Sequence, residues 1–182
     1  MSQDINLLTS FKNGLDIHQT TADFIGTSDR KIAKAVNFGV IYGISAFGLS
    51  KNINISIKEA KEYIDKFYEK YPQIKSFFEK TIEDGEKNGY VESLFGRKRY
   101  LPGLTDRNAI IKNAAKREAM NMPIQATATG DIIKLAMIEV SKYLQKSKLK
   151  TKILLQVHDE LILNVPKSEK EIVKKDVVTI ME

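Results

Sequence analysis

The sequence predicts an α+β fold that is mostly helical and contains antiparallel hairpins, one of which carries carboxylates. Most of the 182 residues lie in segments whose apolar side chains recur every three or four positions, which is the period of an amphipathic helix. Two segments, 90–103 and 152–166, instead have β-prone residues on both sides of a short turn-forming centre, and this is typical of a hairpin. With 42% hydrophobic residues, the chain can bury a core of ordinary size.

The helices are predicted from this periodicity and from the residues that end helices. Pro72 ends one helix, because the residue before a proline avoids the helical conformation, and Gly89 ends another, because glycine readily forms a C-cap. Segments 2–11 and 168–182 have a helical pattern without a start or stop signal, so we expect the chain to be cut from a longer one. The other predicted helices span residues 16–25, 30–42, 57–70, 73–87, 106–127 and 131–145.

The polar centre of the stretch 153-ILLQVHDELIL-163 predicts a tight turn. One continuous buried strand would bury Asp159 and Glu160 without partners, which costs several kcal/mol. A turn at His158-Asp159 instead displays both acids at the tip of a hairpin. Two carboxylates on a rigid tip suit a hard cation such as Mg²⁺, although an ordinary polar turn fits the same residues.

Composition narrows the class of protein. The net charge of +6 and the pI of about 9.3 are compatible with nucleic acid, anionic lipid or phosphate ligands. The absence of cysteine excludes disulfides and thiolate metal sites, and with two histidines a zinc site is not expected. The sequence has no apolar run of bilayer length and no signal-peptide pattern, so a soluble intracellular protein is expected.

The helix predicted over residues 30–42 has one cationic and aromatic face. Side chains four residues apart stack on one side of a helix, and here they are Arg30, Lys34, Phe38 and Tyr42. The other sides of the helix are apolar and suit a core. Such a face fits a ligand that has an anionic part and a planar part.

Three other groups of polar residues are candidates for ligand contacts. Arg117, Asn121 and Gln125 also lie four residues apart, and guanidinium and amide groups can read base edges; the alternative is a polar solvent face. The basic turn 97–99 either meets phosphates or is an ordinary surface turn. His18 either donates to a phosphate oxygen or is an exposed helix residue.

Taken together and in order, these segments resemble the family A DNA polymerases, the DNA polymerase I type. The motifs are DIHQTTA, RKIAKAVNFGVIYG, YVESLFGRKRYLPG, NMPIQATATGD and QVHDEL, preceded by ILL at 153–155. The resemblance implies fingers helices plus part of an antiparallel palm sheet. Residues 1–115 would be mainly fingers, with a lid helix over 30–42 and a hairpin over 90–103. Residues 116–182 would be part of the palm, with a metal-binding hairpin over 152–166.

The resemblance also implies a role for each candidate residue. Asp159 would ligate the catalytic metal ions with Glu160 assisting, and Lys34 would protonate the leaving pyrophosphate. Residues that would contact primer-template DNA are Arg117, Asn121, Gln125 and His158. Residues that would bind the incoming dNTP are His18, Arg30, Lys34, Phe38 and Tyr42. One departure is that QATATGD is one residue longer than the usual family form, which leaves the register after Gln125 open.

The implied function is template-directed transfer of a nucleotide from a dNTP to a primer 3′ end, by a mechanism that uses two Mg²⁺ ions. The partners would be primer-template DNA, dNTPs and the remainder of the polymerase chain, without a membrane, in the cytoplasm of a bacterium or phage-infected cell or in an organelle. The thumb, the exonuclease domain and the first metal-binding Asp motif of the palm are not among these residues. We therefore expect the isolated chain to be inactive; the alternative is a non-catalytic DNA- or nucleotide-binding remnant, or one subunit of a split polymerase.

Overall fold

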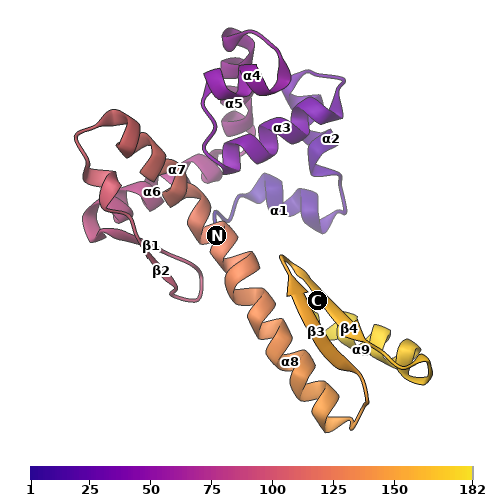
Figure 1. Ribbon diagram of the computed structural model, residues 1–182. Helices are drawn as coiled ribbons and strands as arrows, with labels where there is room; N and C mark the ends of the chain where they lie inside the picture. Colours follow the sequence, from indigo (N-terminus) through magenta and orange to yellow (C-terminus); the bar gives the residue numbers. More distant parts are fainter. Residues whose placement is uncertain (182) are drawn as a thin grey trace. The chain divides into compact units, whose positions relative to one another are not determined.

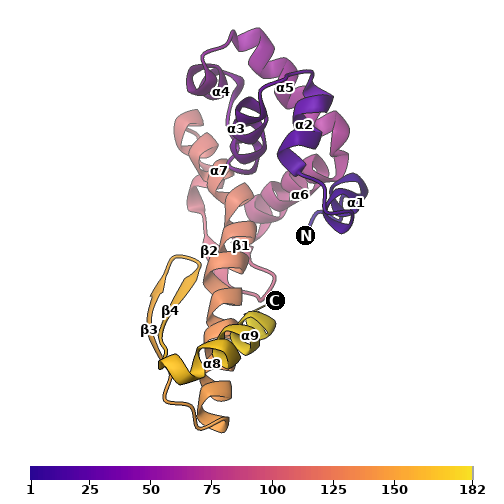
Figure 2. The same ribbon diagram turned by 90° about the vertical axis from the view of Figure 1, so that its right-hand side faces the viewer.

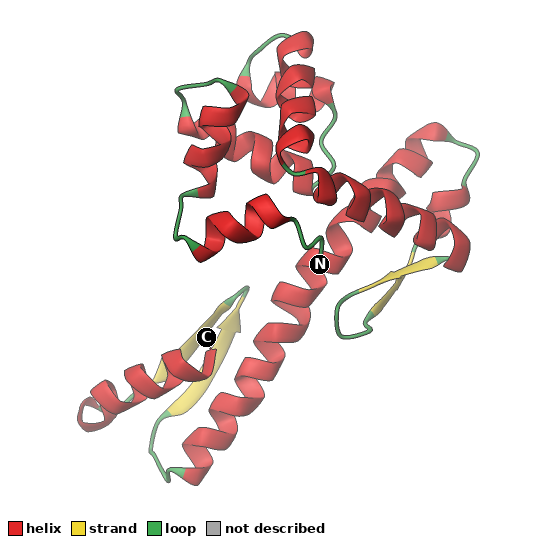
Figure 3. Ribbon diagram, turned by 180° about the vertical axis from the view of Figure 1, so that it is seen from behind, coloured by secondary structure: helices red, strands yellow, loops and turns green. Residues whose placement is uncertain are grey.

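The computed structural model describes residues 1–181, and the chain divides into two compact units. The first unit is Met1–Ile124, and the second begins at Gln125. Both units are mainly helical, and each contains one two-stranded antiparallel sheet (Figure 3). The predicted α+β, mostly helical fold is therefore confirmed. Among the described residues, no helix combines the length and the apolar composition needed to cross a bilayer.

The first unit is built from seven α-helices and a hairpin (Figure 1). Its core lies where α2, α3, α4 and α5 pack together, and α6 adds to it. The helices and strands, in order, are α1 (Ile5–Lys12), α2 (Ile17–Ile25), α3 (Arg30–Ile41), α4 (Ala46–Ile53), α5 (Ile57–Lys70), α6 (Pro72–Asn88), β1 (Tyr90–Glu92), β2 (Lys98–Tyr100), the 3-10 helix η1 (Pro102–Thr105) and α7 (Ala109–Gln125).

Helix α3 is fixed in the first unit by its apolar side. Ala33, Val36 and Val40 are buried in the core, in the same cluster as Ile25 of α2 and Phe67 of α5. Burying a valine or isoleucine side chain stabilises a fold by about 1.5–3 kcal/mol, so these contacts hold the helix firmly. With its apolar side in the core, α3 turns its cationic and aromatic face outward. This confirms the prediction from the sequence, because Arg30, Lys34 and Phe38 are all exposed.

The ends of the helices follow local sequence signals. Asp29 caps α3, because its carboxylate accepts from the backbone N–H of Lys31 at 2.8 Å. Ser56 and Glu59 form a capping box at the start of α5. Helix α6 begins at Pro72 and ends before Gly89, which is left-handed with φ of 79°. The predicted boundaries of α5 are the observed ones, and those of α3 and α6 differ from the observed ones by at most one residue at either end.

Two features of the first unit differ from the prediction. Helix α4 is not among the predicted helices, although Ser45 marks its start by accepting from the N–H of Gly48 at 3.1 Å. The first hairpin is shorter than the predicted range 90–103, because its strands pair only from Tyr90↔Tyr100 to Glu92↔Lys98. After Leu101 the chain turns into the 3-10 helix η1, whose first residue is a proline; proline has no N–H for strand pairing.

The second unit continues directly from α7. It consists of a π-helical segment η2 (Ala126–Ile132), α8 (Ile133–Lys146), β3 (Lys152–Val157), β4 (Glu160–Asn164), the 3-10 helix η3 (Lys167–Glu169) and α9 (Lys170–Met181). Helix α9 packs against α8 (Figure 2). Val140 and Leu144 of α8 and Val173 and Val177 of α9 form the core of this unit, and Leu163 of β4 packs against them.

The predicted break between residues 127 and 131 is wrong, because the chain stays helical there as η2. A π turn holds more residues than an α turn, so a helix can take up an extra residue by forming one. The segment lies on the stretch QATATGD, where the resemblance left the register after Gln125 open. Gly130 therefore lies inside a wide turn and does not end a helix.

Candidate functional site

The start of helix α3 is tied to the start of α2 by one carboxylate. One oxygen of Asp16 caps α2 by accepting from the N–H groups of His18 at 2.9 Å and Gln19 at 3.2 Å. Its other oxygen accepts from the guanidinium of Arg30 at 2.8 Å. The hydrogen bond from Arg30 lowers the pKa of the Asp16 carboxyl. Because both side chains are half exposed, the pair adds little to stability, but it places the Arg30 guanidinium beside α2.

His18, Lys34 and Phe38 lie close together on the same side of α2 and α3. The ring of His18 is 5.7 Å from the ring of Phe38, centroid to centroid, and the Lys34 Nζ is 5.7 Å from the Phe38 ring centroid. Burial lowers the pKa of His18, and the positive charges of Arg30 and Lys34 lower it further, while Asp16 opposes them. The imidazole is therefore neutral at pH 7, and two cations flank it.

The aromatic residues of α3 present large open faces. Phe38 is 47% exposed and Tyr42 is 50% exposed, which leaves their rings free to pack on a planar group. Tyr42 is the C-cap of α3. The structure thus brings together four of the five residues predicted to bind a dNTP (His18, Arg30, Lys34 and Phe38) and places Tyr42 at the end of the same helix.

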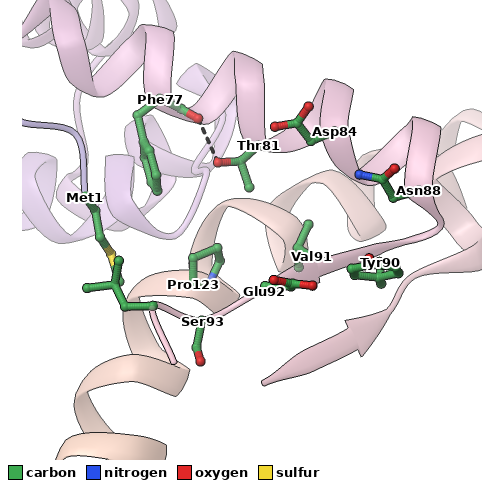
Figure 4. A pocket seen from close by; sticks show the side chains of 11 residues that line it. Met1, Phe77, Thr81, Asp84, Asn88, Tyr90, Val91, Glu92, Ser93 and Pro123 are labelled. Atoms are coloured by element: carbon green, nitrogen blue, oxygen red, sulfur yellow. Dashed lines mark hydrogen bonds between the residues drawn. The ribbon is translucent and has the colours of Figure 1, made fainter. Parts of the chain in front are cut away.

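An apolar pocket of about 420 Å³ adjoins this face. His18, Asn37 and Phe38 form part of its lining, to which side chains of α1, α5 and α6 also contribute. A larger cavity, of about 500 Å³, lies between α6, β1 and Pro123 (Figure 4). In the described part of the chain, that second cavity is lined by none of the residues predicted to bind a ligand.

The end of α3 lies against α7, which carries the predicted DNA contacts. Gly43 has a φ of 67°, and a Cβ at this position would lie 2.9 Å from the Cγ of Arg117. Only glycine fits such a left-handed residue at a close approach. Arg117 and Gln125 are exposed and Asn121 is half-buried. Because α7 is a helix from Ala109 to Gln125, the three side chains keep their four-residue spacing.

The basic turn of the first hairpin is partly neutralised within the first unit. Arg99 pairs with Glu118 at 2.7 Å, and Lys98 approaches Glu92 at 3.5 Å and the Tyr90 ring at 4.2 Å. Arg99 and Lys98 thus both have carboxylate partners. This weakens the hypothesis that the turn is a phosphate-binding patch.

The carboxylate hairpin belongs to the second unit. Val157 pairs with Glu160, so His158 and Asp159 form a two-residue turn, and His158 is left-handed with φ of 54°. The side-chain amide of Gln156 donates to the carbonyl of His158. His158, Asp159 and Glu160 are all exposed. The predicted turn is therefore confirmed, and it displays both acids to solvent.

The donor set of this turn fits a hard cation only in part. Carboxylate oxygens are the ligands that Mg²⁺ prefers. Within residues 1–181, however, no cluster of three or more His, Asp or Glu side chains is arranged to hold a metal ion. Asp159 and Glu160 are thus suited to supply part of a coordination shell whose remaining ligands come from outside this hairpin.

Three residues that organise the face formed by His18, Arg30, Lys34 and Phe38 were not among the residues predicted from the sequence. Asp16 holds Arg30, and Asn37 and Thr21 form a buried hydrogen-bonded chain that ends at His18. The sequence does mark two of them, Asp16 and Asn37, as unusual positions. Asp16 stands directly before a helix, where aspartate is a favoured N-cap, and Asn37 interrupts the apolar side of α3.

The first unit thus has a cationic and aromatic face whose chemistry suits an anionic, planar ligand, and the second unit has a turn that offers carboxylates. The whole chain, residues 1–182, matches the profile of DNA polymerase family A. The chain therefore belongs to the family A DNA polymerases, as its motifs indicated.

Individual relatives agree with this assignment. The chain is 48% identical over 191 aligned residues to DNA polymerase I of Streptococcus pneumoniae and 46% identical over 190 residues to DNA polymerase I of Bacillus subtilis. It also matches a solved structure, the POL domain of Pol1 from M. smegmatis in complex with DNA primer-template and dNTP, with a TM-score of 0.92 and 34% identity over 99% of this chain and 33% of that one. The two alignments with DNA polymerase I cover 100% of the chain but 22% of each relative, so the chain spans about a fifth of their length.

Proposed function

We propose that the chain forms the dNTP-binding part and one metal-binding turn of a DNA-directed DNA polymerase. In the reaction, the 3′-oxygen of a primer attacks the α-phosphorus of a dNTP, the bond to the pyrophosphate oxygen breaks, and the primer gains one nucleotide. The observation that carries this proposal is the grouping of His18, Arg30, Lys34 and Phe38 on one face of α2 and α3. The M. smegmatis relative was solved with primer-template DNA and a dNTP, which supports it.

The α3 face suits a nucleoside triphosphate in both of its parts. Arg30 offers a guanidinium fork that can hold two phosphate oxygens, and Lys34 offers an ammonium group that also donates a proton to the leaving pyrophosphate. His18 adds a neutral donor. Phe38 packs on the sugar and base, and Tyr42 lies near the template base. Phosphoryl transfer depends mainly on such positioning and charge neutralisation.

The other candidate residues have roles with DNA and metal. Arg117, Asn121, Gln125 and His158 contact the growing end of the primer-template, where minor-groove acceptors common to all base pairs let geometry be checked without sequence preference. Asp159, assisted by Glu160, supplies oxygen ligands to divalent cations, of which Mg²⁺ fits best. Bound there, the cations polarise phosphate oxygens and lower the pKa of the attacking hydroxyl.

In family terms, we assign residues 1–115 mainly to the fingers and residues 116–182 to part of the palm. The remainder of a polymerase chain then provides the thumb and the other metal-binding carboxylate. The complete polymerase acts wherever primed DNA is copied. The chain's net charge of +6 favours contact with the phosphate backbone of DNA.

A chimaeric polymerase tests this proposal. Residues 1–182 replace the matching segment of DNA polymerase I of Bacillus subtilis, and extension of a labelled primer is measured with one dNTP at a time. We expect each dNTP to be added only opposite its complementary template base, and only with Mg²⁺ present. A folded chimaera that binds primer-template and dNTP but adds no nucleotide would contradict the proposal and support a non-catalytic binding remnant.

A further inference from the structure

Asn37 links α3 to α2 through two buried hydrogen bonds. The hydroxyl of Thr21 donates to the Oδ1 of Asn37 at 3.0 Å, and the Nδ2 of Asn37 lies 2.8 Å from the Nδ1 of His18. Thr21 is fully buried and Asn37 is 6% exposed, so water competes little for these groups. A buried amide must satisfy both of its ends, and here the two ends have different partners.

The direction of the hydrogen bond between Thr21 and Asn37 determines the direction of the one between Asn37 and His18. Because the Oδ1 of Asn37 accepts the Thr21 hydroxyl, the amide end that faces His18 is the NH₂ group, which can only donate. The Nδ1 of the imidazole must then accept, and the single proton of the neutral ring lies on Nε2. Within residues 1–181, no side chain or carbonyl accepts a hydrogen bond from this Nε2–H.

The charges around His18 keep the ring in the neutral form that this chain of hydrogen bonds requires. Arg30 and Lys34 face it from α3, and Asp16 faces it from the start of α2. Tyr71, which lines the adjoining pocket, has a pKa raised by burial and carries no charge at pH 7. Burial and the two cations outweigh Asp16, so the pKa of His18 is lowered.

We propose that Thr21 and Asn37 are positioning residues that hold His18 as the Nε2–H tautomer, so that it donates to a phosphate oxygen of the incoming nucleotide. This inference rests on the phosphate-binding role proposed for His18. In the opposite tautomer, the Nε2 lone pair would face a phosphate oxygen, and the hydrogen bond would be lost. The tautomer therefore contributes directly to triphosphate affinity, although neither Thr21 nor Asn37 touches the nucleotide.

The tautomer can be read by NMR of the 182-residue chain labelled with ¹⁵N-histidine. The chain has two histidines, and His158, exposed on a hairpin turn, is an internal control. At alkaline pH, where imidazole side chains are neutral, we expect His18 to show a protonated Nε2 and an acceptor-type Nδ1. Asn37→Asp, whose carboxylate only accepts, should move the proton to Nδ1. Thr21→Val, which keeps the shape but frees the amide to turn, should give a mixture, and the His158 signals should stay unchanged.

Nucleotide affinity provides the second readout. His18→Phe should weaken dNTP binding about tenfold, as expected for the loss of one hydrogen bond to a charged oxygen. Thr21→Val should weaken it about threefold when His18 is present, because part of the population holds the wrong tautomer. In the His18→Phe background, Thr21→Val should have no further effect. A purely structural role of Thr21 would instead weaken binding equally in both backgrounds.

Three outcomes would overturn parts of this account in distinguishable ways. A protonated Nδ1 in the unmodified chain would overturn the tautomer assignment, and so would spectra that neither Asn37→Asp nor Thr21→Val changes. If the spectra agree with expectation but His18→Phe leaves dNTP affinity unchanged, the phosphate-binding role of His18 is wrong, and the proposed function is the part that has failed.

Discussion

Replacing Asp159 by Asn in the chimaeric polymerase should lower the rate of nucleotide addition by about a thousandfold or more. Metal ions contribute several kcal/mol to stabilising a phosphoryl-transfer transition state, and each 1.4 kcal/mol is a factor of ten in rate. The substitution removes a charged ligand while keeping the size of the side chain. The hairpin should be unaffected, because Asp159 is exposed in a two-residue turn and Asn is equally suited to turns.

The measurement is the single-turnover rate of primer extension at increasing Mg²⁺ concentration. Glu171→Gln is the matched control, since it removes one exposed carboxylate of the same unit, on α9, without changing side-chain size. The control should retain the full rate. A loss of less than about tenfold for Asp159→Asn at saturating Mg²⁺ would show that Asp159 is not a metal ligand in this polymerase.

The second large effect is expected for Arg30→Ala, which should weaken dNTP binding to the 182-residue chain about 10- to 100-fold. Hydrogen bonds to charged groups contribute about 1.5–3 kcal/mol, and an arginine can make two to one phosphate. In the nucleotide-free chain the same guanidinium is bound to Asp16 at 2.8 Å, so a triphosphate must compete with that carboxylate. Because both side chains of this pair are half exposed, breaking the pair costs little free energy.

Lys31→Ala is the control for this prediction, because it removes the same charge from the next residue of α3. Successive helix residues differ by about 100° around the axis, so Lys31 does not share the face of Arg30 and Lys34. We expect less than a threefold loss of dNTP affinity for Lys31→Ala, because a screened surface charge acts weakly at a distance. Equal losses for the two variants would mean that Arg30 acts only through net charge and does not hold the phosphates.

The face of α3 could be predicted from the sequence because it depends on local rules. Val36 and Val40 have the spacing that buries one side of a helix, and the structure places both in the core. That leaves Arg30 and Phe38 on the exposed side. The turn at His158-Asp159 was predictable for a similar reason, since two adjacent carboxylates are too costly to bury within a strand.

The rest of the site depends on contacts between residues that are distant in sequence. Asn37 lies 16 residues from Thr21 and 19 residues from His18 along the chain, and no periodicity connects such positions. The π-helical segment η2 was also outside local rules, because Gly130 favours a break in an isolated peptide, whereas in the structure the helix passes through it. Helix α4 has eight residues, which is too short for its apolar period to be distinctive.

The most direct test of the central claim, that the α2–α3 face binds the triphosphate, is to titrate the ¹⁵N-labelled 182-residue chain with a deoxynucleoside monophosphate and with the corresponding triphosphate. We expect a much higher affinity for the triphosphate, with the largest amide shifts around His18, Arg30, Lys34 and Phe38. Equal affinities, or shifts confined to the cavity around Phe77 and Thr81 (Figure 4), would contradict it.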